Sequence, residues 1–110
     1  MTPLNRAAIP VKQWAVGSNT FTAAGTATVT PTLPGGAIGR PVKIKASGSV
    51  AGYATLNIGT QAQVVVLINP NAAYTEEPIP ASAFPSPVGS APVSVTASGA
   101  GVVTVAIGFA

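Results

Sequence analysis

The segment "PVSVTASGAGVVTVAIGFA", residues 92–110, decides the fold class, because apolar and polar side chains alternate along both of its halves. In the first half the alternation places Val93 and Val95 on one side, and in the second half it ends at Phe109. Side chains that alternate in this way lie on opposite faces of a β-strand, one buried and one exposed. The glycine-containing Gly99–Gly101 segment predicts a hairpin between the two strands.

The same alternation recurs along the whole chain, whereas no long stretch has the spacing of a helix. Twelve glycines and eleven prolines interrupt the sequence at short intervals, which also disfavours helices. A two-residue Gly48-Ser49 turn predicts a further hairpin. The expected strands are residues 11–16, 20–32, 41–47, 50–58, 62–68, 92–98 and 101–110. Seven or eight short strands at this spacing predict one all-β domain over residues 1–110, an antiparallel sandwich or barrel preceded by an extended arm at residues 1–10.

The segment "TFTAAGTATVTPTL", residues 20–33, holds six of the twelve threonines of the chain. Its alternation predicts an inward face of Phe21, Ala23, Ala27 and Val29 and an outward face of threonine. The glycine and proline within it, Gly25 and Pro31, predict two short strands around a corner instead of one long strand. The threonine face meets either water or another subunit.

Charge is scarce, since only 6% of the residues are charged, against about 25% in an ordinary protein. A surface with so little charge predicts that other protein covers part of it. The longest strongly apolar run is "VVVLI", residues 64–68, far short of the roughly 20 residues of a spanning helix. Because this run is apolar on both faces, it predicts a central strand or one covered by a neighbour. We expect no membrane partner and no signal peptide.

The residues that usually carry catalysis are missing from the sequence, which contains no His, Cys or Asp. Glu76 and Glu77 are its only acidic side chains, and on an extended chain two adjacent side chains point to opposite faces. The sequence therefore predicts a protein that is not an enzyme and has no metal site and no cofactor.

Three basic residues lie close together in "RPVKIK", residues 40–45, and make Arg40, Lys43 and Lys45 candidate partner-binding residues. Together they could form a basic strip that docks on an acidic surface. The alternative, which we favour, is an edge strand that its lysines protect against unwanted pairing. Nucleic acid is a poor partner, because its recognition needs more basic residues or interleaved aromatics.

The long segment at residues 69–92 holds six of the eleven prolines and both glutamates. A connection of this length is uncommon in a compact domain. It is either a plain crossover between the sheets or a crossover that also contacts a partner. In the second case Tyr74 and Phe84, its two aromatic residues, are candidate partner-binding residues.

Taken as a whole, the chain resembles small jelly-roll proteins of bacteriophage virions. The resemblance lies in the opening "MTPLNRAAIPVKQW", in strands rich in Ala, Thr, Gly, Val and Pro, and in the paired closing strands of residues 92–110. It implies a jelly-roll-like sandwich that acts as a decoration or cement protein on the capsid exterior. Such proteins stabilise the shell by contacts with the major capsid protein or other virion proteins, often as homotrimers. In this resemblance the arm bridges neighbours, with Arg6 and Lys12 as its charged residues, and the protein is made in the host cytoplasm.

Two other functions stay open at the level of sequence. One is a receptor-binding or carbohydrate-binding sandwich at a fibre or spike tip, for which Trp14, Tyr53 and Tyr74 are candidate sugar-stacking residues. Against it, a tryptophan on an alternating strand such as Trp14 is expected in the core. The other is a different structural position in the same particle, at a vertex or in the tail.

Overall fold

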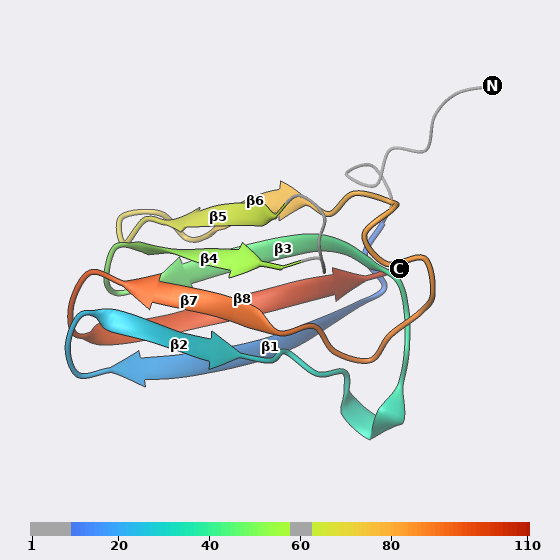
Figure 1. Ribbon diagram of the computed structural model, residues 1–110, viewed down its shortest axis with the longest axis horizontal. Helices are drawn as coiled ribbons and strands as arrows, with labels where there is room; N and C mark the ends of the chain where they lie inside the picture. The colour runs from blue at the N-terminus through green and yellow to red at the C-terminus, as the bar shows by residue number, and fades with distance from the viewer. Residues whose placement is uncertain (1–9, 58–62) are drawn as a thin grey trace.

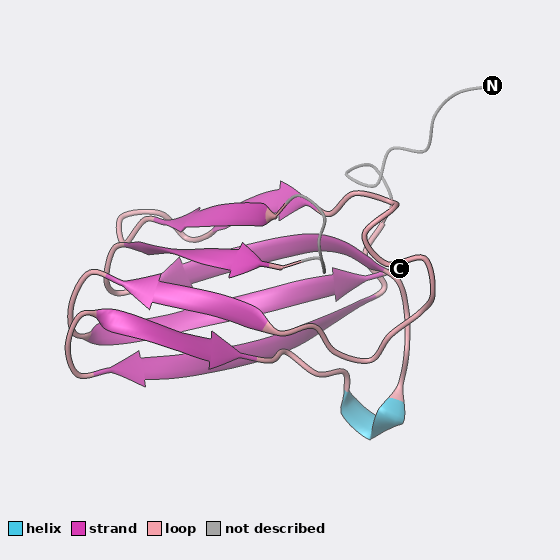
Figure 2. Ribbon diagram, in the orientation of Figure 1, coloured by secondary structure: helices cyan, strands magenta, loops and turns pink. Residues whose placement is uncertain are grey.

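The computed structural model describes residues 10–57 and 63–110, which form eight β-strands and one short 3₁₀ turn (Figures 1 and 2). The strands are β1 (Gln13–Phe21), β2 (Gly25–Val29), β3 (Pro41–Gly48), β4 (Gly52–Leu56), β5 (Val64–Ile68), β6 (Thr75–Pro78), β7 (Val93–Ala97) and β8 (Gly101–Phe109). The turn, η2 (Pro34–Gly36), lies between β2 and β3 and contains two glycines with positive φ angles. None of the described residues belongs to a helix long and apolar enough to span a bilayer.

The strands form two four-stranded antiparallel sheets that pack face to face, which confirms the predicted all-β sandwich (Figure 1). Sheet A has the order β1-β8-β3-β6, and sheet B has the order β2-β7-β4-β5. The first strand thus pairs with the last, the second with the seventh, the third with the sixth and the fourth with the fifth. Each strand of the first half of the chain thus pairs with one of the second half, and successive pairs alternate between the two sheets.

The core lies between the sheets and is built from the alternating apolar residues of both. Val93, Val95 and Ala97 of β7 face the core from sheet B. From sheet A, β8 contributes a row of buried side chains that ends at Phe109. The predicted inward faces of these two strands are confirmed. Most core side chains are valine, isoleucine or alanine, which fit the flat space between two pleated sheets.

The threonine-rich segment turns a corner, as predicted. Strand β1 ends at Phe21 in sheet A and β2 begins at Gly25 in sheet B, so the predicted inward residue Ala23 lies in the turn and is exposed. As a result, the threonines divide between two surfaces. Thr20 lies on the outer face of sheet A, whereas Thr26 and Thr28 lie on β2 in sheet B.

The two predicted hairpins are wrong, because their strands belong to different sheets. The turn after Gly48 carries the chain from β3 in sheet A to β4 in sheet B, and the Gly99–Gly101 turn carries it from β7 in sheet B to β8 in sheet A. At these crossings the absence of a side chain on glycine lets two backbone segments lie close together. A Cβ on Gly48 would come within 2.9 Å of the Val102 carbonyl oxygen.

One prediction of strand position is wrong, and a second loses one of its two alternatives. Strand β3, expected as an edge strand guarded by its lysines, lies inside sheet A, because the short strand β6 from the proline-rich segment pairs along its outer side. Strand β5 forms an edge of sheet B, which excludes a central strand and leaves the alternative of a strand covered by a neighbour. Its Val64, Val66 and Ile68 are buried, and the two apolar residues between them are exposed.

Candidate functional site

The charged residues of the described chain all belong to sheet A or to the segments that lead into it. Lys12 precedes β1 and Arg40 precedes β3, while the remaining charges lie within β3 and β6. Sheet B therefore carries no charged side chain on any of its four strands. The sandwich is polarised, with one charged sheet and one uncharged sheet.

The outer face of sheet B is built from two rows of side chains that cross all four strands. The β-ladder registers align Thr26, Thr96, Tyr53 and Leu67 in one row and Thr28, Ser94, Thr55 and Val65 in the other. We call these eight residues the uncharged face. Five of the eight are small hydroxyl side chains, and the other three, Tyr53, Val65 and Leu67, are large and apolar and lie on β4 and β5.

Three large apolar side chains of the uncharged face are open to solvent. Tyr53 is 44% exposed, Val65 47% and Leu67 66%. The hydroxyl side is already ordered, since the Thr26 and Thr96 hydroxyl oxygens lie 3.0 Å apart and share a hydrogen bond. A flat surface with ordered hydroxyls beside exposed apolar groups has the composition of a protein interface with a dry side and a polar side.

The outer face of sheet A carries a different feature, a lysine held between two aromatic rings. The Lys45 ammonium lies 4.0 Å from the centre of the Trp14 ring and 5.0 Å from the centre of the Tyr74 ring. A cation over an aromatic face is attracted by the negative potential of the ring. Trp14 is half-buried and faces outward from β1, so the expectation that it belongs to the core is wrong.

The place of Trp14 depends on Gly108, which faces it across the β1–β8 pair. A Cβ at position 108 would lie 2.7 Å from a methyl carbon of Val11 and 3.0 Å from the Trp14 ring. Glycine at this position therefore leaves the space that the Trp14 ring occupies beside β8 on its way to Lys45.

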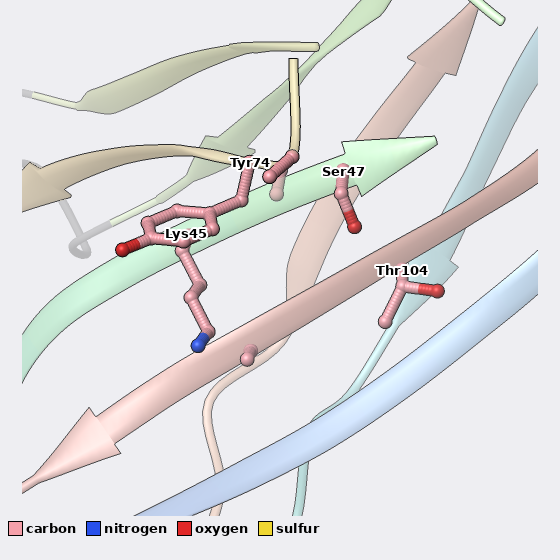
Figure 3. Close-up of a pocket in the computed structure, with 7 residues that line it drawn as sticks. Lys45, Ser47, Tyr74 and Thr104 are labelled. Carbon is pink, nitrogen blue, oxygen red and sulfur yellow. The ribbon is translucent and has the colours of Figure 1, made fainter. Parts of the chain in front are cut away.

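A pocket of about 210 Å³ opens beside Lys45 on the same face. Figure 3 shows Lys45 and Tyr74 on one side of this pocket and the hydroxyl side chains of Ser47 and Thr104 on the other. Ala106 also lines it, and is buried although it points out of the sheet. We call this site the lysine–tyrosine pocket.

The other predicted partner-binding residues lie around this sheet in separate settings. Lys43 shares the outward face of β3 with Lys45, as predicted, but its ammonium lies 3.7 Å from Glu76 of β6. Lys12 is exposed just before β1, and Arg6 lies outside the described residues.

Arg40 and Phe84 lie close to each other on the proline-rich segment side of sheet A. The Arg40 guanidinium donates to the carbonyl oxygen of Pro85 at 2.8 Å and lies 3.5 Å from that of Phe84. The Phe84 ring is half-buried against the core. Both residues hold the long connection in place, and their role in partner binding stays a prediction.

The meeting of Trp14, Lys45 and Tyr74 is the feature that sequence reasoning missed. Trp14 and Tyr74 were candidate sugar-stacking residues and Lys45 a candidate partner-binding residue, but the three lie in segments far apart in the chain and were not expected to meet. Their contact depends on β8 lying between β1 and β3, and on β6 bringing Tyr74 to the far side of β3. No pattern within a single segment of the sequence predicts that strand order.

Comparison with known proteins assigns no family to the chain. No protein-family model matches it, and neither a curated protein nor a solved structure is similar enough to count as a match. The two outer faces of the sandwich therefore carry the evidence for function.

Proposed function

We propose that this protein is a non-enzymatic structural component of a bacteriophage virion that binds the capsid exterior through the uncharged face. The observation that carries the proposal is the absence of charge from the strands of sheet B, together with the exposure of Tyr53, Val65 and Leu67. Its role is to decorate and stabilise the shell by contacts between proteins.

The physical reason is the cost of removing charge from water. An ion buried in an interface without a partner loses several kcal/mol of solvation, so the centres of protein interfaces are depleted of charge and enriched in aromatic residues. The uncharged face meets both conditions, with Tyr53 near its middle and no ion to desolvate. The partner surface should be equally poor in charge, because it would otherwise bury its own ions against valine and threonine.

The strand order supports a jelly-roll arrangement of the sandwich. A jelly roll joins two four-stranded sheets through two Greek keys, and wrapping one ribbon of pairs β1–β8, β2–β7, β3–β6 and β4–β5 gives such a double sheet. Together with the resemblance of the chain to small virion proteins, this favours a capsid protein over other uses of an uncharged sandwich. We propose a homotrimer in solution, with no cofactor.

The experiment compares one substitution on each outer face. Val65 on sheet B and Val102 on sheet A are both outward-facing valines, 47% and 45% exposed. Val65→Lys should weaken co-sedimentation with shells of the major capsid protein by at least about tenfold, the equivalent of 1.4 kcal/mol. Val102→Lys should bind as the unmodified chain does.

Two results would contradict the proposal. One is equal binding of the two variants to capsid shells, since the uncharged face would then not be the surface that binds. The other is the failure of the unmodified protein to bind any capsid shell while it remains a monomer at high concentration. Mass measurement in solution separates this second case from a homotrimer.

A further inference from the structure

The lysine–tyrosine pocket lies on the sheet opposite to the uncharged face, so a protein docked through sheet B leaves it open to solvent. Its chemistry differs from that of a docking surface. It combines one ammonium, the hydroxyls of Ser47 and Thr104, and one face of the exposed Tyr74 ring. These groups can recognise a small polar molecule but offer little apolar area to a protein.

Among residues 10–57 and 63–110, no carboxylate lies within 4 Å of the Lys45 ammonium, although Glu76 faces Lys45 across the β3–β6 pair. The chain has only two acidic side chains, and the one ion pair between side chains of the described residues joins Glu76 to Lys43. The two aromatic rings position the Lys45 ammonium but leave its N–H groups able to donate. Because Glu76 is engaged by Lys43, the two lysines and one glutamate leave one net positive charge beside the pocket, which favours an anion.

The two hydroxyls opposite Lys45 also have unused hydrogen-bonding capacity. Within the described part of the chain, neither the Ser47 nor the Thr104 hydroxyl makes a hydrogen bond. A hydroxyl group both donates and accepts. A ligand that carries hydroxyls of its own would satisfy both side chains at once.

The size of the pocket limits the ligand to one small ring or a chain of similar bulk. Its volume of about 210 Å³ is below the roughly 300–1,000 Å³ of clefts that hold drug-sized molecules. The exposed face of Tyr74 supplies a flat apolar surface of the kind on which the C–H face of a sugar ring stacks. A fatty chain would leave the hydroxyls and the ammonium without partners, and a neutral sugar would leave the charge without one.

We propose that the lysine–tyrosine pocket binds a sugar residue that carries a carboxylate, such as a uronic acid at the end of a glycan. In this assignment Lys45 pairs with the sugar carboxylate, Ser47 and Thr104 hydrogen-bond to its hydroxyl groups, and Tyr74 packs against its ring. On a particle that carries many copies of the protein, each pocket would bind acidic polysaccharide weakly. Many weak sites on one particle together give a higher overall affinity.

The test is a titration of the full chain with glucuronate, followed by NMR amide shifts. Glucose serves as the uncharged control and free glutamate as the mimic of an acidic protein side chain. We expect saturable shifts around Lys45, Tyr74 and Thr104 with glucuronate, weaker at high salt because a charge pair is involved. Glucose should produce no saturable shift at the same concentration.

Two substitutions and one control separate the site from general electrostatics. Lys45→Gln should reduce glucuronate affinity at least about tenfold. Thr104→Val keeps the β-branched shape and removes one hydroxyl, so it should cost about three- to tenfold without harming the fold. Lys12→Gln removes the same charge as Lys45→Gln from an exposed position outside the pocket and should leave binding unchanged.

Three results would overturn the proposal. Absence of saturable shifts up to tens of millimolar glucuronate would remove the site, and equal losses in Lys45→Gln and Lys12→Gln would reduce it to bulk charge. Binding of glutamate as tight as that of glucuronate would assign the pocket to acidic protein side chains instead. None of these results depends on whether the uncharged face binds a capsid.

Discussion

Replacing Gly108 by alanine should destabilise the sandwich, because Val11 and Trp14 occupy the space that a Cβ would need. The new methyl group would lie 2.7 Å from one methyl carbon of Val11 and 3.0 Å from the other and from the Trp14 ring. Overpacking of this kind costs about 1–3 kcal/mol. Displacing the ring from Lys45 forfeits about 0.5–1 kcal/mol more.

A gain in the unfolded state partly offsets this loss. Glycine to alanine lowers the entropy of the unfolded chain, which stabilises the fold by about 0.4–1 kcal/mol where the site can accept the methyl group. The net loss for Gly108→Ala is therefore about 1–3 kcal/mol. Gly25→Ala is the matched control, since a Cβ there meets nothing within 4 Å and its φ angle is not positive. It should be neutral or slightly stabilising.

Urea unfolding followed by tryptophan fluorescence measures both effects in one experiment. Trp14 is the only tryptophan of the chain, so its emission reports the site directly. In Gly108→Ala the folded-state emission should shift to the red, because the displaced ring becomes more exposed to water. If Gly108→Ala is as stable as Gly25→Ala and its emission is unchanged, the packing described around Trp14 is incorrect.

Three further substitutions test other contacts by chemical denaturation. Arg40→Ala removes the guanidinium that holds the proline-rich segment and should cost about 1 kcal/mol and speed proteolysis of that segment, whereas Lys12→Ala should cost nothing measurable. Gly52→Ala should cost about 3 kcal/mol or more, because its Cβ would overlap the Thr96 carbonyl oxygen inside sheet B; near-native stability would refute the β4–β7 register. Glu76→Gln should change stability by no more than about 0.5 kcal/mol, since its pair with Lys43 is partly exposed to water, and a loss above 1 kcal/mol would show a larger role.

The inward faces of the strands could be read from the sequence because a period of two is a local property. Val95 and Val105 are buried in the structure for the reason that their alternation indicates. The corner near Gly25 was equally local, because a glycine and a proline close together in one alternating segment favour a bend or a strand end. These features depend on neighbours in the chain and not on the way that the sheets assemble.

The strand order could not be read, because a turn does not reveal which sheet the next strand joins. Gly48-Ser49 has the residues of a tight hairpin, yet it crosses between sheets. The same limit applies to β3. Its lysines indicate an edge strand until the four-residue strand β6, hidden among prolines, is known to cover it.

The candidate sites followed the same division. The scarcity of charged residues could be seen in the composition. That the few charged residues gather on sheet A could be seen only once the structure placed β3 and β6 side by side. Lys45 and Tyr74 were both candidates for partner binding, for unrelated reasons. Their shared pocket with Thr104 depends on three strands that are distant in sequence.

The central claim is that the uncharged face, and not sheet A, is the docking surface, and a cysteine-labelling experiment tests it most directly. The natural chain has no cysteine, so Val65→Cys and Val102→Cys each introduce a single reactive thiol, on sheet B and sheet A respectively. Both parent side chains are about equally exposed, so the thiols should react with a maleimide at similar rates in the free protein. On capsid shells, the thiol at position 65 should be protected and the thiol at position 102 should stay reactive. Protection at position 102 with continued reactivity at position 65 would contradict the account.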